Sequence, residues 1–367
     1  MRATRTAFRA SNCPGRAFTT RGAFAGRTSV QTSFLKNLDA VVHPAASLFA
    51  SLLPKPAATS DGETLIIRPG GLGDLVCADI ALEELGQDAR AFTWLIETRS
   101  QPWAEFRELP HFCYDGNGLA IPSEVQNRFS LVINTEQLFG LAESCALLCR
   151  AKGGRVISFD TNRGSGRSDE TVPYDWQDAH ETMEFARLFA AALKLPYEAT
   201  PREPRPRKQP DSAPPLVLIA GRQSRSRQLT VEEWAALVAR WHGGRSFLIA
   251  ATPDDAAFAV QLARRFEGLG APFAGSFAET CRQIARSEEI FTMDGGGVHI
   301  ASYFGVSTLA MFTSGRDRKW HPLGEGSRML RRHDLPCQPC TKFGQVPPCA
   351  NSYACLKLDD GGSGDIG

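Results

Sequence analysis

The sequence lacks any long apolar run: among its 367 residues, none approaches the roughly 18 consecutive apolar residues that a membrane-spanning helix needs. It also lacks an excess of either charge, because 41 lysines and arginines stand against 40 aspartates and glutamates. A nucleic-acid-binding protein usually carries a marked excess of positive charge. We therefore expect a soluble protein without a nucleic-acid partner, and a chain of this length can form two domains with sizeable cores.

Acidic residues are absent from the first 38 positions, which contain six arginines and Lys36 among many Ser, Thr, Ala and Gly residues. This composition is typical of an organelle transit peptide, and equally of a disordered basic arm that contacts anionic lipid. An unstructured extension without a role is the third interpretation. No apolar core with a small-residue cleavage site follows, so a secretory signal is not expected. Residues 35–53 are predicted to form a short amphipathic helix that Pro44 interrupts.

Cysteine is plentiful, with ten residues, and six of them are scattered as expected for buried thiols of a cytosolic protein. The other four form a C-x2-C-x8-C-x5-C pattern near the carboxyl end: Cys337, Cys340, Cys349 and Cys355. Four thiolates at short spacing can hold a tetrahedral zinc or an iron. One or two disulfides, or free thiols, are the alternatives, and the spacing is not one of the common zinc-finger spacings.

Residues 291–312 contain the most informative pattern, an apolar run followed by three glycines, an amphipathic stretch, Gly305 and a second apolar run. This pattern predicts a strand, a glycine loop, a short helix and another strand. Gly295, Gly296 and Gly297 would leave backbone N–H groups uncovered at a helix N-terminus, where a diphosphate binds well. The alternative is that the glycines only permit a tight turn. Asp294 and His299 bracket the loop and are expected to face its ligand.

Strands alternate with helices along the rest of the chain, which predicts parallel pairing and a doubly wound α/β sheet in each half. In the first half, a strand at 65–67 leads through Pro69–Gly73 to a helix from Asp74 to Leu85, with Asp74 at or near its N-cap. In the second half, Thr230 is predicted to cap a helix over Val231–Trp241. We expect a basic, disordered extension over 1–60 and an N-terminal Rossmann-like domain over 61–195. A proline-rich linker over 196–215, a C-terminal Rossmann-like domain with a cysteine-rich end over 216–358 and a flexible tail over 359–367 are expected to follow.

Three stretches resemble the signature regions of glycosyltransferase family 9, in the same order: RPGGLGDLVCADIALEEL (68–85), GRQSRSRQLTVEEW (221–234) and MDGGGVHIASYFGVSTLAMFTSGRDRKWHPLG (293–324). The cysteine pattern at 337–355 is similar to a cluster that many relatives carry. Members of this family are bacterial heptosyltransferases, which move heptose from ADP-heptose onto lipopolysaccharide core or onto protein. The resemblance implies the GT-B architecture, with two facing Rossmann-like domains, the acceptor on the first and the nucleotide sugar on the second.

Carried over by position, Asp74 matches the family's proposed general base, which takes the proton of the acceptor hydroxyl in an inverting transfer. Arg227 stands where the family usually has a phosphate-contacting lysine, and arginine can bind phosphate in a bidentate manner. The growing charge of the leaving diphosphate needs such fixed positive partners. With them in place, no metal or other cofactor is required for catalysis.

The remaining donor residues also follow from the resemblance. Gly295, Gly296 and Gly297 would supply amides to the diphosphate, while Asp294 and His299 match residues that contact sugar hydroxyls or phosphate. Asp254, or its neighbour Asp255, aligns with an acidic residue that holds the ribose. The resemblance further implies a cytoplasmic enzyme, with peripheral contact at the inner membrane face, that acts on a glycolipid, glycan or protein acceptor.

Two departures from the family pattern keep a second interpretation open. Gly295 replaces the usual threonine, and the chain stops soon after Cys355, where relatives usually continue into further helix. The alternative is a non-catalytic member that binds nucleotide sugars or acts as a scaffold.

Overall fold

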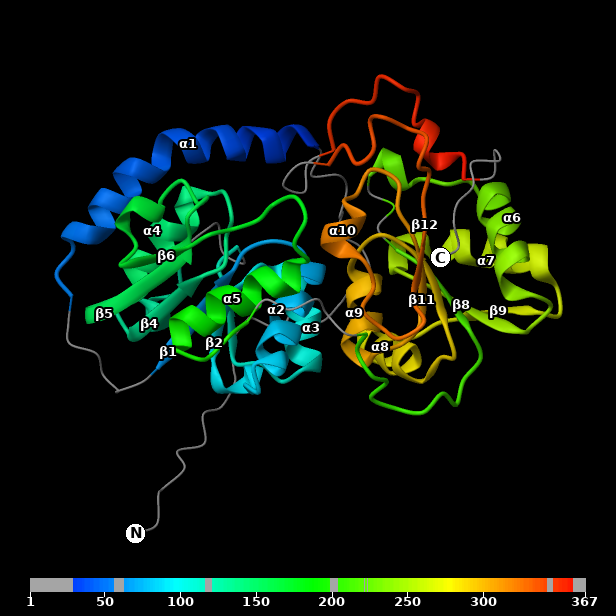
Figure 1. Cartoon of the computed structure of the whole chain (residues 1–367), viewed down its shortest axis with the longest axis horizontal. Helices are drawn as coiled ribbons and strands as arrows, with labels where there is room; N and C mark the ends of the chain where they lie inside the picture. The colour runs from blue at the N-terminus through cyan, green and yellow to red at the C-terminus, as the bar shows by residue number, and fades with distance from the viewer. Residues whose placement is uncertain are drawn as a thin grey trace, which may run out of the picture. The chain divides into compact units, whose positions relative to one another are not determined.

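The computed structural model describes residues 29–55, 63–115, 121–198, 204–220, 222, 224–341 and 346–358, with side chains described from Asp39 onward. The chain divides into two compact units (Figure 1). Unit 2 consists of Leu72–Ala81, Asp175–Phe185 and Glu198–Gly367, and unit 1 contains the remaining residues. The predicted boundaries at 60, 195 and 215 stay a prediction. No helix in the described part of the chain is both long and apolar enough to cross a membrane.

Unit 1 is built on a parallel sheet with the strand order β3-β2-β1-β4-β5-β6. The strands are β1 (Thr64–Arg68), β2 (Thr93–Ile96), β3 (His111–Cys113), β4 (Phe129–Asn134), β5 (Arg150–Phe159) and β6 (Glu170–Val172). The helices are α1 (Ser29–Leu52), α2 (Leu72–Glu84), α3 (Gln101–Phe106), α4 (Gly140–Cys149) and α5 (Glu181–Leu193), of which α2 and α5 are shared with unit 2. The central strand β1 is apolar and buried, as a strand covered on both faces must be.

Unit 2 repeats the arrangement, with the order β12-β11-β10-β7-β8-β9. Its strands are β7 (Leu216–Ile219), β8 (Phe247–Ala251), β9 (Gly270–Phe273), β10 (Ile290–Met293), β11 (Thr308–Met311) and β12 (Arg328–Leu330). Its helices are α6 (Val231–His242), α7 (Ala256–Ala263), α8 (Phe277–Arg286), α9 (Gly296–Phe304) and α10 (Asp317–Trp320). In both sheets the chain reverses direction beside the first strand of the unit, as in a Rossmann fold. The prediction of two doubly wound α/β sheets is confirmed.

Local predictions and local structure agree at most elements and differ clearly at α1. Asp74, predicted at or near the helix N-cap, lies in the first turn of α2, which begins at Leu72. Pro44 lies inside α1 and does not interrupt it. The helix runs from Ser29 to Leu52, so the expectation of a disordered segment is wrong for these residues, which pack against α4. Helix α6 begins at the predicted cap, where Thr230 and Glu233 form a reciprocal capping box.

Candidate active site

The glycine loop lies at the carboxyl end of β10, where ligands of such sheets bind. Gly295 has a φ of 156°, which side-chain-bearing residues rarely adopt, and Gly296 begins α9. An added Cβ at Gly296 would lie 2.8 Å from Leu72 Cδ2, and one at Gly297 would lie 2.4 Å from Leu218 Cδ2. At both positions the added Cβ would meet a leucine methyl group, so that leucine side chain would have to shift, whereas the space beside Gly295 is open.

The start of α2 approaches this loop within unit 2. A Cβ added to Gly73 would lie 2.7 Å from His299 Cδ2 and 3.5 Å from Gly296 Cα. Asp74 is the next residue, and its charge acts on the imidazole of His299. The structure thus brings the predicted base, the glycine loop and the predicted histidine together.

His299 is held in a defined, uncharged state. Burial lowers the pKa of His299 to about 4, and the nearby carboxylates of Asp294 and Asp74 only partly offset that effect. Its Nδ1 lies 3.4 Å from the buried thiol of Cys77, and its ring meets Trp320 edge to face at 5.4 Å between centroids. A neutral imidazole has one N–H donor and one acceptor nitrogen, so His299 can donate a hydrogen bond without carrying a charge.

Arg227 and Asp294 form an ion pair, with Arg227 Nη2 donating to Asp294 Oδ2 at 2.7 Å. The carboxylate is buried and the guanidinium is one quarter exposed. Arg227 Nε is buried and has no hydrogen-bond acceptor in the described part of the chain. Asp294 therefore orients Arg227, and the free Nε–H is a donor that a bound anion can use.

The ribose residue predicted at 254 or 255 lies after β8, at the same carboxyl edge of the sheet. Asp254 is exposed. Asp255 accepts a hydrogen bond from Thr252 Oγ1 at 2.9 Å and lies 3.3 Å from Arg222 Nη1. The structure therefore places both carboxylates at the predicted edge but brings neither into contact with the glycine loop.

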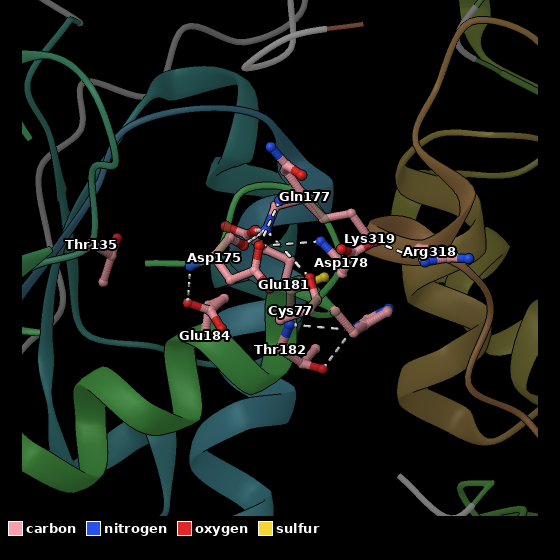
Figure 2. A network of polar contacts seen from close by, with 12 residues as sticks. Cys77, Thr135, Asp175, Gln177, Asp178, Glu181, Thr182, Glu184, Arg318 and Lys319 are labelled. Atoms are coloured by element: carbon pink, nitrogen blue, oxygen red, sulfur yellow. Dashed lines mark hydrogen bonds and ion pairs between the residues drawn. The ribbon is translucent and has the colours of Figure 1, made fainter. Parts of the chain in front are cut away.

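Lys319 belongs to a buried polar cluster that sequence reasoning missed (Figure 2). Its ammonium lies 2.8 Å from the carboxylate of Glu181, and both side chains are almost inaccessible to solvent. It also donates to the backbone carbonyls of Asp175 and Ala179. This cluster fastens the segment before α5 to α10, and no local pattern indicates it because its charged partners are far apart in the sequence.

The carboxyl-terminal cysteines support the loop that carries Arg227. The N–H of Cys340 donates to Ser314 O, and Ser314 Oγ lies 2.8 Å from Ser226 Oγ. Burial, followed by the neighbouring thiols, raises the pKa of Cys355 to about 11 and raises that of Cys340. All four thiols are free, and in the described residues no group of three or more His, Cys, Asp or Glu side chains is arranged to hold a metal.

Comparison with known proteins identifies the family. A family model described as glycosyltransferase family 9 (heptosyltransferase) matches residues 123–350. The two Rossmann-like sheets and the glycine loop are thus those of a glycosyltransferase, and the chain belongs to glycosyltransferase family 9. A search of the curated proteins finds no match.

Solved structures share the fold at low sequence identity. The E. coli heptosyltransferase WaaC with ADP is 16% identical, with 73% of this chain and 92% of that chain covered and a TM-score of 0.56. The E. coli ADP-heptose lps heptosyltransferase II is 14% identical, covering 74% and 91% with a TM-score of 0.55. A family 9 glycosyltransferase from Veillonella parvula is 12% identical, covering 82% and 96% with a TM-score of 0.57. These likenesses confirm the predicted GT-B fold class.

Proposed function

We propose that this protein is an inverting, metal-independent glycosyltransferase that transfers a sugar from a nucleotide sugar, with ADP-heptose as the favoured donor. The observation that carries the proposal is the approach of the α2 start to the glycine loop, which brings Gly73 and Asp74 beside His299 and Gly296. The similar WaaC structures contain ADP and ADP-2-deoxy-2-fluoro heptose, which supports this choice of donor.

In the proposed reaction, Asp74 takes the proton of the acceptor hydroxyl while its oxygen bonds to the anomeric carbon of the donor sugar. The bond from that carbon to the diphosphate oxygen breaks on the opposite face, and the diphosphate leaves with the electron pair. Arg227 and the amides of Gly295–Gly297 stabilise the charge that develops on the leaving group. Neutral His299 donates a hydrogen bond to the sugar or phosphate, and Asp254 or Asp255 binds the ribose.

Nucleotide release tests the proposal. The protein is incubated with ADP-, UDP- and GDP-sugars, and the released nucleoside diphosphate is measured with and without glycolipid, glycan and peptide acceptors. We expect release from an ADP-sugar, and Asp74→Asn is expected to lower turnover by roughly two to four orders of magnitude while donor affinity stays nearly unchanged. Binding of nucleotide sugars without any turnover would favour the non-catalytic interpretation, and normal turnover in Asp74→Asn would remove Asp74 from its role.

The four carboxyl-terminal cysteines lie close together in the sequence, at a spacing short enough for one metal ion. We propose that Cys337, Cys340, Cys349 and Cys355 together hold a structural zinc or iron when metal is supplied. Elemental analysis of the purified protein decides this, because metal well below one equivalent would dismiss the site.

We also propose a cytoplasmic protein in peripheral contact with the inner membrane face. Cell fractionation with sequencing of the mature N-terminus distinguishes this location from import into an organelle.

A further inference from the structure

Helix α1 packs against unit 1 through the polar side chains of Asp39 and Ser47 and through the buried Ala50. The carboxylate of Asp39 accepts hydrogen bonds from the backbone N–H groups of Gly140 and Leu141 at 3.1 and 2.8 Å. These are the first residues of α4, so a buried carboxylate satisfies the free N–H groups at a helix start. About two helical turns further along α1, Ser47 Oγ lies 2.7 Å from Ser144 Oγ. Figure 1 shows α1 lying alongside α4.

The opposite face of α1 is apolar and exposed, whereas the outward face of a surface helix is usually polar. Its large side chains keep much of their area in solvent: Val41 76%, Val42 37%, Leu48 50%, Phe49 66% and Leu52 73%. The other exposed residues from 40 to 54 are Ala, Pro and Ser51, whose hydroxyl already donates to Ser47 O. No charged side chain is exposed on this stretch. We call Val41, Val42, Leu48, Phe49 and Leu52 the α1 stripe.

The α1 stripe is exceptional within the described part of the molecule. Only one other large hydrophobic side chain is exposed there, Val260 on α7, at 41%. Contiguous exposed apolar surface on a folded protein marks an interaction site more often than isolated exposed residues do. The specific hydrogen bonds of Asp39 and Ser47 with α4 fix the orientation of α1, so the apolar stripe faces outward as a consequence of the sequence.

We propose that the α1 stripe is a docking surface for an anionic lipid bilayer. A single helix face suits a bilayer surface, into which apolar side chains of interfacial helices insert to the depth of the headgroup boundary. The charge pattern fits as well, because the sequence before Asp39 contains seven basic residues and no acidic one. Basic residues beside an interfacial helix are attracted to anionic headgroups. The proposal assigns the membrane contact proposed above to a specific face of α1, and it does not depend on the proposed glycosyl transfer.

A second copy of the chain is the competing occupant, and the size of the stripe argues against it. Stable homodimers bury about 800 Å² or more on each partner. Five partly exposed side chains on one helix offer less than that.

Vesicle sedimentation tests the proposal with a matched pair of variants. Full-length protein, Phe49→Asp and Val260→Asp are each mixed with phosphatidylcholine vesicles, with and without phosphatidylglycerol. Both variants place the same charge at an exposed apolar position on a helix, so both should fold, and thermal unfolding checks this. We expect the wild type and Val260→Asp to sediment with the anionic vesicles, and Phe49→Asp to partition at least about tenfold less well. Release of nucleoside diphosphate in solution is expected to be unchanged in all three.

Three results would overturn the proposal. The first is a wild-type protein that does not sediment with anionic vesicles. The second is Phe49→Asp binding as well as Val260→Asp, which would show that the basic N-terminal residues suffice without the stripe. The third is a dimer in sedimentation velocity that Phe49→Asp dissociates, which would assign the stripe to a second copy. Loss of vesicle binding with normal nucleotide release leaves the proposed function intact, so failures of the two proposals are distinguishable.

Discussion

Replacing Gly73 by alanine tests the approach of α2 to the glycine loop. Gly73 is the second residue of α2, so helix propensity alone favours alanine by about 0.5–1 kcal/mol. The added Cβ would lie 2.7 Å from His299 Cδ2, whereas carbon atoms pack at about 3.5–4.0 Å. The imidazole cannot retreat freely, because Trp320 lies against it and Cys77 contacts its Nδ1. We therefore expect a net destabilisation, with an overpacking cost of about 1–3 kcal/mol exceeding the gain in propensity.

The matched control is Gly166→Ala. Gly166 is exposed, and a Cβ there meets nothing within 4 Å. Alanine at such a position is expected to leave stability unchanged or to raise it by about 0.4–1 kcal/mol. Urea unfolding gives the free energies, and release of ADP from an ADP-sugar reports on the site. We expect Gly73→Ala alone to lose both stability and turnover. Wild-type behaviour of Gly73→Ala in both assays would show that α2 does not press on His299 as described.

Two further predictions follow from the polar groups of the site. The pKa of His299 is about 4 in the folded protein and near its ordinary value of 6.5 when unfolded, so the unfolded chain binds the proton first as the pH falls. The resulting contribution to the free energy of unfolding is present above pH 6.5 and is lost between pH 6.5 and 4, by on the order of 3 kcal/mol. Urea titrations should show the free energy of unfolding of the wild type falling more steeply over this pH range than that of His299→Gln. Equal slopes for the two proteins would contradict the prediction. Arg227→Ala is expected to weaken ADP binding and also to destabilise the fold, because it leaves the buried Asp294 carboxylate without its partner. Calorimetry measures the affinity, and an unchanged value would exclude Arg227 from the diphosphate site.

Short-range patterns in the sequence predicted most elements that carry the donor residues. The apolar run, three glycines and amphipathic stretch at 291–305 correctly predicted β10, the loop and α9. Such predictions succeed because hydrophobic periodicity and glycine content influence the local backbone conformation of neighbouring residues. The capping box at Thr230 was equally local. The predicted interruption at Pro44 was wrong: α1 continues through Pro44, because its packing against α4 holds the helix together beyond what the local sequence indicates.

The sequence by itself therefore determined the two doubly wound α/β sheets and the glycine loop, because strands, helices and turns depend on residues a few positions apart. Only the tertiary structure decided which side chains meet. The sequence shows Cys77 as one of several buried thiols, and only the structure places it beside His299. Lys319 and Glu181 are far apart in the sequence, and they form an ion pair only because α10 packs against the start of α5. Tertiary contacts likewise decided which face of α1 is exposed. Asp39 and Ser47 contact residues of α4 about a hundred positions away, so the apolar stripe faces outward.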